Sequence, residues 1–309
     1  MAHPLKSAEF RRLLDARLTS VFEEHSKKQE VKSVIPTLFN VVSSEKAWEE
    51  HFYVTGVPDI NEFSGKLAYL AQYPGFHKKI EHKEYAGGIA AERKLMEDKL
   101  YGVLERNSRD LNRSAMRVRE KKGVRLLSSA FSSAFDYMTS EEGQPLCSSS
   151  HTVKTGVSTS TGFDNSGTTA LSKTSVAATR LLMRRFKTDI GERFDPSENL
   201  ALVVPDNLAD TAREIVGTDK GLDTGDGNIN PQYQRHQVIP ILRLDDTDTN
   251  NWFMMDMDNS KDSFVFYDRV KPDYNQTVDF DTFQLLQSVY MRISYGWLDW
   301  RCIYGHTAS

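Results

Sequence analysis

The stretch Glu92–Met138, ERKLMEDKLYGVLERNSRDLNRSAMRVREKKGVRLLSSAFSSAFDYM, predicts the long element around which the rest of the chain is organised. Its apolar residues recur at steps of three, four or seven, which keeps them on one helical face. A continuous helix of this length would span about 70 Å at roughly 1.5 Å per residue. We expect Gly102 and Gly123 to bend or break it. The charged first half predicts a structural spine laid across a surface.

The charge of this spine differs from that of the whole chain. Residues 93–125 carry 11 Lys and Arg against 5 Asp and Glu, a net +6 in a chain whose formal net charge is −4. Four arginines at steps of three and four form one stripe along the predicted helix. The stripe is either a solvated face paired with Glu105 and Asp110, or a surface that faces nucleic acid phosphates or acidic neighbouring subunits. Its members are Arg106, Arg109, Arg113 and Arg117.

The sequence before the spine predicts an arm. Residues 7–25 have the period of an amphipathic helix, and the polar residues 26–33 predict a flexible connector after it. One helix cannot bury its own apolar stripe. We therefore expect the arm to pack on another element or on a neighbouring subunit.

A change of period to two between Ser64 and Gly88 predicts a β-hairpin that turns at Pro74-Gly75. The hairpin either lies on its own domain or projects and is completed by a partner chain, because an isolated hairpin is marginally stable in water. In the second case its exposed edges are contact surfaces. The candidate contact residues between subunits are Leu67, Tyr69, Tyr73, Pro74, Gly75 and Phe76.

The remainder predicts a mixed α and β domain. Residues 139–168 are polar and predict a long loop, and a helix is expected over 169–187. The apolar run 200–204, closed by Pro205, predicts a strand followed by a helix that ends at Gly217. Further strands are expected at 238–244, 252–257 and 263–269. Residues 285–304 predict a final strand of about 65 Å at roughly 3.3 Å per residue.

The sequence carries no catalytic constellation. Cys147-x3-His151 has no second ligand pair for a structural zinc site. The acidic run from Asp256 to Asp262 resembles a calcium loop but has Lys261 at position six and Tyr267 at position twelve, so a hairpin turn explains it better. Scattered histidines are expected to be solvated or capping. We predict no catalytic residue, metal or cofactor, and no enzyme activity.

Composition limits the compartment and the class. The hydrophobic fraction of 39% is that of a soluble protein, and no apolar run approaches the roughly 20 residues of a membrane helix. Two distant cysteines cannot form a disulfide framework, so we expect a reducing compartment and no membrane partner.

The order of these pieces resembles tailed-phage major capsid proteins, and more specifically the Mu-type major head subunit family. The resemblance begins near Trp48 and covers most of the chain after it. The resembling residues are Trp48-Glu-Glu, Glu84-Tyr-Ala-Gly-Gly-Ile89 with Glu92-Arg93, Gly143-Gln-Pro-Leu146 with His151, Leu200-Ala-Leu-Val-Val-Pro205, Trp252-Phe253, Tyr295-Gly-Trp-Leu-Asp-Trp-Arg301 and Tyr304-Gly305.

This resemblance implies an α+β fold of the HK-ninety-seven type. The expected parts are an N-terminal arm (1–62), an E-loop hairpin (63–92), a P-domain with the long spine helix (93–150), mainly an A-domain (151–262), and a return to the P-domain with long strands (263–309). It implies no catalytic residues.

The implied function is a major capsid protein of a tailed double-stranded DNA phage or prophage. Its partners would be copies of itself, in pentamers and hexamers of an icosahedral shell, and the packaged DNA through non-specific charge contacts. Portal, scaffold and decoration proteins are further candidate partners. The shell would be assembled in the bacterial host cytoplasm and become the virion capsid. The alternatives are an encapsulin-like shell that holds cargo enzymes, and a soluble α/β enzyme or binding protein with an accessory arm.

Overall fold

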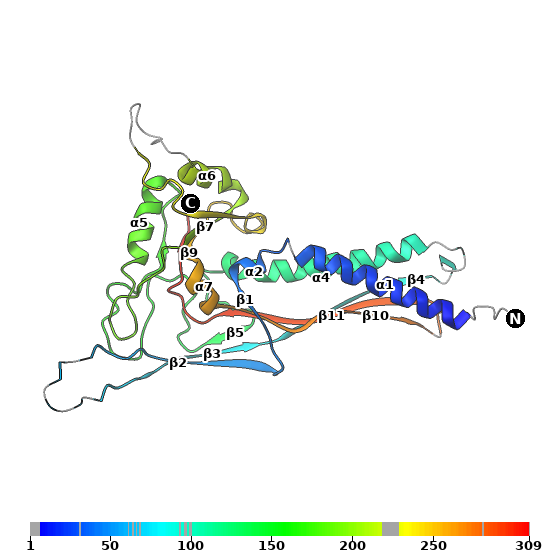
Figure 1. The fold of residues 1–309 in the computed structure, drawn as a ribbon, viewed down its shortest axis with the longest axis horizontal. Coiled ribbons are helices and arrows are strands. Elements are labelled where there is room, and N and C mark those ends of the chain that lie inside the picture. Colours follow the sequence, from blue (N-terminus) through cyan, green and yellow to red (C-terminus); the bar gives the residue numbers. More distant parts are fainter. Residues whose placement is uncertain are drawn as a thin grey trace.

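The computed structural model describes residues 7–30, 32–60, 62–63, 65, 67, 69–92, 94–95, 98, 101–217, 229–279 and 281–308, with the backbone alone for residues 7–15. Figure 1 shows three parts: a long layer of two helices over a sheet, an upright block at one end of that layer, and a loop that projects beneath the block. The chain therefore combines helices and strands in an α+β fold.

The spine is the helix α4 (Tyr101–Ser128), and its end differs from the sequence prediction. We expected helix up to Met138, but the chain turns after Ser128 and Met138 begins strand β5 (Met138–Ser140). The Ser129 hydroxyl donates to the carbonyl of Arg125 at 2.5 Å, a local bond that competes with helix continuation. The carbonyl of Ala130 accepts instead from the amide of Cys147, at 2.8 Å.

Gly123 does not break the spine as predicted, because it lies inside α4. A Cβ atom at this position would come within 2.7 Å of the Ile35 side chain. Ile35 is the first residue of the short helix α2 (Ile35–Leu38). The glycine therefore permits a close approach between the two helices, and its cost in helix propensity is about 1 kcal/mol.

The N-terminal helix α1 (Ser7–Glu30) lies along α4. Leu18 and Phe22 are buried in one cluster with Leu104 and Leu111 of α4. The arm therefore packs on its own spine. The predicted connector 26–33 is helical as far as Glu30, because this last turn carries basic residues that suit the helix dipole.

A four-stranded sheet lies under the two helices, in the order β1 (Asn40–Ser43), β10 (Phe264–Val278), β11 (Leu285–Trp297), β4 (Lys83–Ala91). β1 is parallel to β10, and the other pairs are antiparallel. Every second residue of β11, including Val289, Met291 and Ile293, is buried, as the sequence predicted. Val289 and Met291 pack in one cluster with α1 and α4, and Ile293 belongs to a second, larger cluster.

The predicted final strand of 20 residues is two strands. β11 ends at Trp297, and β12 (Ile303–His306) begins in a different sheet. The intervening turn is fixed by the amide of Leu298, which donates to the carbonyl of Ser263 at 2.7 Å. The carboxylate of Asp299 accepts from the amide of Arg301 at 3.0 Å, which stabilises the turn locally.

A second, three-stranded sheet has the order β2 (Trp48–Val54), β3 (Pro74–Glu81), β5. It corrects the predicted hairpin, since Pro74-Gly75 begins β3 and makes no turn. β3 pairs antiparallel with β2, which lies before the loop, and on its other edge with β5. After β3 the chain enters β4, and so passes from the small sheet into the large one.

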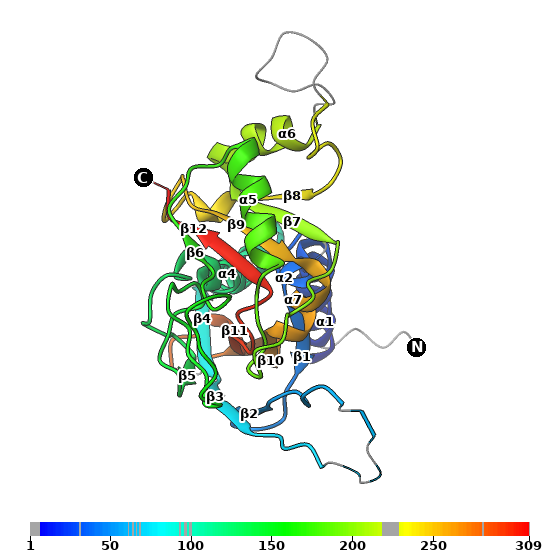
Figure 2. The same cartoon turned by 90° about the vertical axis from the view of Figure 1, so that its left-hand side faces the viewer.

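The upright block is built on a five-stranded sheet in the order β6 (Ser166–Gly167), β12, β9 (Trp252–Asp256), β7 (Leu200–Pro205), β8 (Gln237–Ile241). Figure 2 shows α5 (Lys173–Met183) in front of this sheet and α6 (Ala209–Gly217) above it. The predicted strand at 200–204 and the helix ending at Gly217 are confirmed, and β7 extends one residue further to Pro205.

The connections in the block include two short 3-10 helices, η1 (Asp206–Leu208) and η2 (Leu242–Leu244). The acidic run after β9 forms the helix α7 (Met257–Ser263), where we expected a hairpin turn. The side chain of Asp256 caps α7 by accepting from the amides of Asp258 and Asn259 at 3.1 Å each. The run that resembled a calcium loop is therefore a helix start.

Candidate assembly and genome-facing surfaces

The loop between β2 and β3 is closed at its base. The amide of Thr55 donates to the carbonyl of Tyr73 at 2.9 Å, and the amide of Tyr73 donates to the Thr55 hydroxyl at 2.9 Å. Thr55 is itself buried. The two ends of the 56–72 loop are therefore held side by side by the fold.

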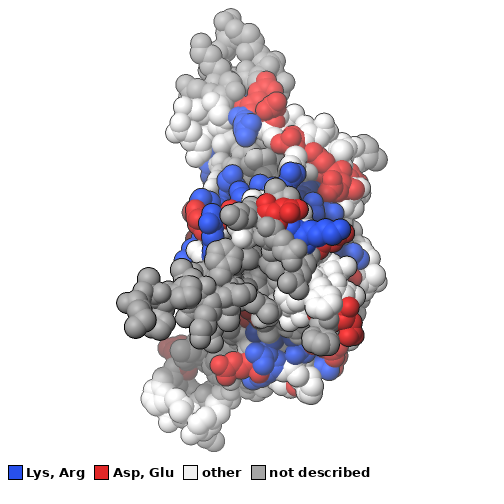
Figure 3. All heavy atoms as spheres, turned by 90° about the vertical axis from the view of Figure 1, so that its right-hand side faces the viewer, with Lys and Arg blue, Asp and Glu red and all other residues white. Residues whose placement is uncertain are grey.

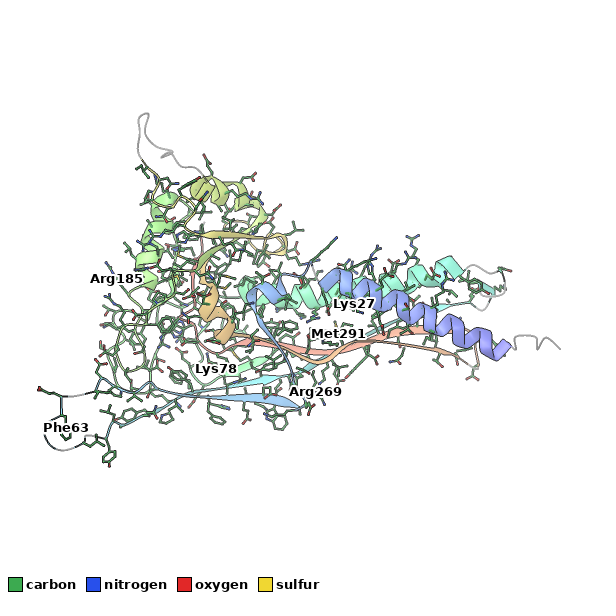
Figure 4. All side chains as sticks on the ribbon, viewed as in Figure 1. Lys27, Phe63, Lys78, Arg185, Arg269 and Met291 are labelled. Carbon is green, nitrogen blue, oxygen red and sulfur yellow. The ribbon has the colours of Figure 1, made fainter. Side chains whose placement is uncertain are left out.

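The tip of this loop is apolar and open to solvent. Ile60, Phe63, Leu67 and Tyr69 are 90%, 71%, 64% and 93% exposed. Figure 4 shows Phe63 at the far end of the loop, away from the rest of the chain. Monomeric proteins rarely leave such a group of large apolar side chains in water, and its presence marks an interaction surface.

The six predicted contact residues lie in two places. Leu67 and Tyr69 are on the exposed loop, while Tyr73 is at its base and 51% exposed. Pro74, Gly75 and Phe76 begin β3. Phe76 is half-buried beneath the Lys154 ammonium, which lies 5.3 Å from its ring centroid.

Lys78 lies just after this base and is buried, a feature that the sequence did not predict. Its ammonium donates to the carbonyl of Leu298 at 2.8 Å and lies 3.1 Å from the ring centroid of Trp297. Burial lowers the pKa of Lys78 to about 7, although the carboxylate of Asp299 opposes the shift. The sequence held one signal: Lys78 has the same strand parity as Ile80, which is fully buried.

A second buried charge cluster joins the turn after β11 to the block. Arg301 is paired with Asp189 and, at 3.1 Å, with Asp299, and its Nε donates to the carbonyl of Lys187 at 2.7 Å. Burial raises the pKa of Asp299, but the Arg301 guanidinium outweighs it and keeps this pKa below its ordinary value. These groups fix the turn and offer no free nucleophile or base.

The four arginines of the basic stripe lie on the exposed face of α4, as their spacing predicts. Arg106 and Arg113 lie 3.7 and 3.1 Å from Asp110, and Arg109 lies 3.8 Å from Glu105. Figure 3 shows Lys and Arg interspersed with Asp and Glu at this end of the molecule. Within the described part of the chain, Arg117 is the stripe member without an ion-pair partner.

Arg119 lies on the opposite, buried side of the spine and was not predicted as a site residue. Its guanidinium pairs with the Asp268 carboxylate of β10 at 2.6 Å. Burial raises the pKa of Asp268, while Arg119 partly offsets this effect. This pair fastens the helix to the sheet.

Cys147 and His151 belong to a packed junction. The His151 ring stacks on Trp300 at 4.2 Å, and its nitrogens lie 2.9 Å from the Glu142 carboxylate and 3.1 Å from Asn165. Burial raises the pKa of the Cys147 thiol. Among the described residues no group of three or more potential ligands is placed to hold a metal ion.

The scattered histidines were expected to be solvated or capping, and the solvated alternative is wrong for four of them, since His82, His151, His236 and His306 are buried. Burial lowers the pKa of His236 and of His306 to about 4, so both rings are neutral at physiological pH.

None of the helices within the described ranges is both long enough and apolar enough to cross a bilayer.

These features define a class of protein. A spine helix on a long sheet, a separate sheet block and a projecting apolar loop suit a subunit that is completed by its neighbours, and the described residues hold no catalytic arrangement. A family described as phage capsid protein matches residues 78–305. The chain belongs to this phage capsid protein family, so its function is structural.

Solved capsid structures share the fold. The Mycobacterium phage Patience structure has a TM-score of 0.58 at 9% identity, covering 96% of this chain and 89% of that one. The capsid of cyanophage P-SCSP1u has a TM-score of 0.53 at 12% identity, covering 90% and 88%. The capsid of the native GTA particle has a TM-score of 0.51 at 12% identity, covering 89% of each. The chain therefore has the HK-ninety-seven-type capsid fold. No curated protein matches the sequence.

Proposed function

We propose that this protein is the major head subunit of a tailed double-stranded DNA phage or prophage, of the Mu type. In this proposal it assembles with itself into pentamers and hexamers of an icosahedral shell that encloses the genome. The observation that carries the proposal is the exposed apolar tip of the 56–72 loop, which the subunit cannot bury alone. Symmetric closed assemblies supply such a surface with an identical partner surface at every position.

We infer the parts of the subunit from the resemblance to capsid proteins. The N-terminal arm is 1–62, the E-loop 63–92, the P-domain 93–150 and 263–309, and the A-domain mainly 151–262. Two strands modify this division. β2, which lies within 1–62, pairs with β3 at the base of the loop. β12, which lies within 263–309, pairs with β9 in the sheet of the block. We infer assembly in the bacterial host cytoplasm and a final location in the virion.

Further partners follow from the charge and from a relative. The basic stripe of Arg106, Arg109, Arg113 and Arg117 is the candidate contact for packaged DNA or for acidic patches of neighbouring subunits. One similar structure is the capsid of bacteriophage JBD30 decorated with minor capsid protein trimers; it has a TM-score of 0.52 at 17% identity and covers 68% of this chain. Decoration, portal and scaffold proteins are therefore candidate partners here.

A loop deletion tests the proposal. Residues 56–72 can be replaced by Asn-Gly, because Thr55 and Tyr73 are already paired and a two-residue turn can close the strands. We expect the variant to fold with unchanged thermal stability and to form no shells by electron microscopy and sedimentation. Shells of normal size would refute the role of the loop.

A second variant keeps the loop length. Ile60→Ser with Tyr69→Ser removes the two most exposed apolar side chains of the tip. The matched control is Val103→Ser with Leu182→Ser, which removes two apolar side chains that are 41% and 39% exposed on α4 and α5. We expect assembly to fail in the first pair and to continue in the second. Equal effects in both pairs would mean that the tip has no special role.

A further inference from the structure

A cavity of about 270 Å³ lies where α1 ends, beside α4 and beneath η2. Figure 1 shows this corner between the helical layer and the upright block, where the segment after β8 lies over α4. The cavity therefore has walls from the spine on one side and from the block on the other. Its cationic wall residues are Lys32, Arg113, Arg117, Arg119 and Arg243.

The two carboxylates of the cavity wall are committed to other groups. Glu120 accepts from the Ser33 hydroxyl at 2.6 Å and from the amide of Val34 at 3.0 Å, so it holds the chain at the start of α2. Glu30 lies 3.7 Å from the Arg119 guanidinium. Five cations therefore face two carboxylates, and the wall carries a net positive charge.

Three of the cations have no carboxylate of their own. In the described ranges, neither Lys32, Arg117 nor Arg243 has an acidic side chain within ion-pair distance. Arg243 is half-buried and Arg117 is exposed. Like charges held together without an anion repel one another, so this group favours a bound anion.

Arg119 adds a positive charge, held in a fixed position, to the cavity wall. Its side chain is only 9% exposed, and Asp268 holds the guanidinium in place at 2.6 Å. The guanidinium also lies 5.2 Å from the ring centroid of Phe266. Its buried Nε has no hydrogen-bond acceptor. The Oδ1 atom of the paired Asp268 is also buried and lacks a donor, so a small rotation within this pair would satisfy both atoms without a ligand.

We propose that this cavity binds a phosphate group. Phosphate presents several acceptor oxygens, and the planar fork of arginine binds two of them at once. The group could belong to the DNA backbone or to a free phosphate. A phosphate here would contact α4 of the spine and η2 of the block together, and so would fix the angle between them. The site does not depend on shell formation, so it can be tested on the unassembled subunit and can fail separately from the proposed function.

The test is calorimetric titration of the full-length subunit with inorganic phosphate and, separately, with a 12-base-pair DNA duplex. The cavity variant is Arg117→Gln with Arg243→Gln. The matched control, Arg185→Gln with Arg213→Gln, removes the same charge from exposed positions on the block, outside the cavity. We expect at least tenfold weaker binding in the cavity variant and a change below twofold in the control. Urea unfolding verifies that both fold, and Arg117→Gln alone serves if the double variant does not.

The two probes distinguish the sources. Cavity-dependent binding of inorganic phosphate identifies a free phosphate as a ligand, and cavity-dependent binding of the duplex identifies the DNA backbone. Either result supports the site. The proposal is overturned if the wild-type subunit binds neither probe at millimolar concentration, or if the control variant weakens binding as much as the cavity variant, since the attraction would then be diffuse.

Discussion

Lys78→Met tests whether the base of the projecting loop contains a buried charge. The substitution keeps an unbranched side chain of similar length and removes the ammonium that lies over Trp297 and donates to the Leu298 carbonyl. The pKa of Lys78 is about 7 in the folded protein and 10.5 as the ordinary value. A lysine whose folded pKa is depressed makes the stability depend on pH in a defined direction.

The sign follows from proton binding. Between pH 7 and pH 10.5 the unfolded chain holds the Lys78 proton while the folded chain has largely released it, so the unfolded state binds more protons and the free energy of unfolding rises with pH. Below pH 7 both states are protonated and Lys78 contributes no slope. With these two pKa values, the contribution rises by about 3 kcal/mol between roughly pH 6 and pH 9.

The assay is urea unfolding of the unassembled subunit at several pH values, for wild type and for Lys78→Met. Other titrating groups affect both proteins, so we expect the stability of wild type relative to the variant to rise by about 3 kcal/mol across this range. Lys79→Met is the matched control on the same strand, because Lys79 is partly exposed and pairs with Glu81 at 2.6 Å. A difference between wild type and Lys78→Met that stays flat with pH would show that the ammonium is solvated, and would refute the reasoning.

Two further predictions concern packing. Trp297→Ala should lower the free energy of unfolding by about 3–5 kcal/mol because this residue is fully buried. Trp48→Ala, at a residue that is 48% exposed, should lower it by under about 1 kcal/mol. Equal losses in urea unfolding would contradict the burial assignment. Gly305→Ala places a Cβ 2.8 Å from the Cys147 sulfur and should cost about 1–3 kcal/mol. Gly102→Ala, with open space around it, should stay within about 0.5 kcal/mol, and a reversed order in thermal unfolding would refute the packing argument.

The sequence predicted best the elements whose pattern is local. The strand at 200–205 is a continuous apolar run closed by proline, and all of its residues are buried on both faces of the sheet. Alternation along β11 predicted its buried face because one side of that strand packs against the helices. In both cases the spacing of the apolar side chains along the strand matches the number of faces on which the strand is buried.

The errors arose where distant contacts decide. Pro74-Gly75 has the residue types of a turn. The β3 backbone nevertheless pairs with β2 across the loop, and Val54 lies opposite Pro74 at the end of this pairing. The break after Trp297 depends on Ser263, which is 35 positions away from Leu298. The two members of each pair are too far apart in the sequence for a local pattern to relate them. Periodicity alone therefore could not predict these contacts.

The sequence predicted the candidate surfaces only where it predicted that their side chains are exposed to solvent. The stripe of arginines followed from helical spacing, whereas the exposed loop was predicted only as a β-hairpin with exposed edges. Lys78 and the pair of Arg119 with Asp268 were not predicted, because charged residues in a polar sequence are expected to face water. Their burial results from contacts between residues that are distant in the sequence. Arg119 and Asp268, for example, are 149 positions apart.

The structure also changes the meaning of the charge asymmetry in the spine. The net +6 of residues 93–125 indicated a basic spine, and part of that charge is neutralised within the fold. Arg119 is paired with Asp268, and Arg125 lies 2.6 Å from Asp136, which also lies 3.9 Å from Lys122. Among the described residues of the spine, Lys94, Arg117 and Lys121 have no ion-pair partner, and of these Arg117 lines the cavity beneath η2. Hence Arg117 is the stripe member whose charge is most available to a polyanion, and the cavity variants at Arg117 and Arg243 test its contribution directly.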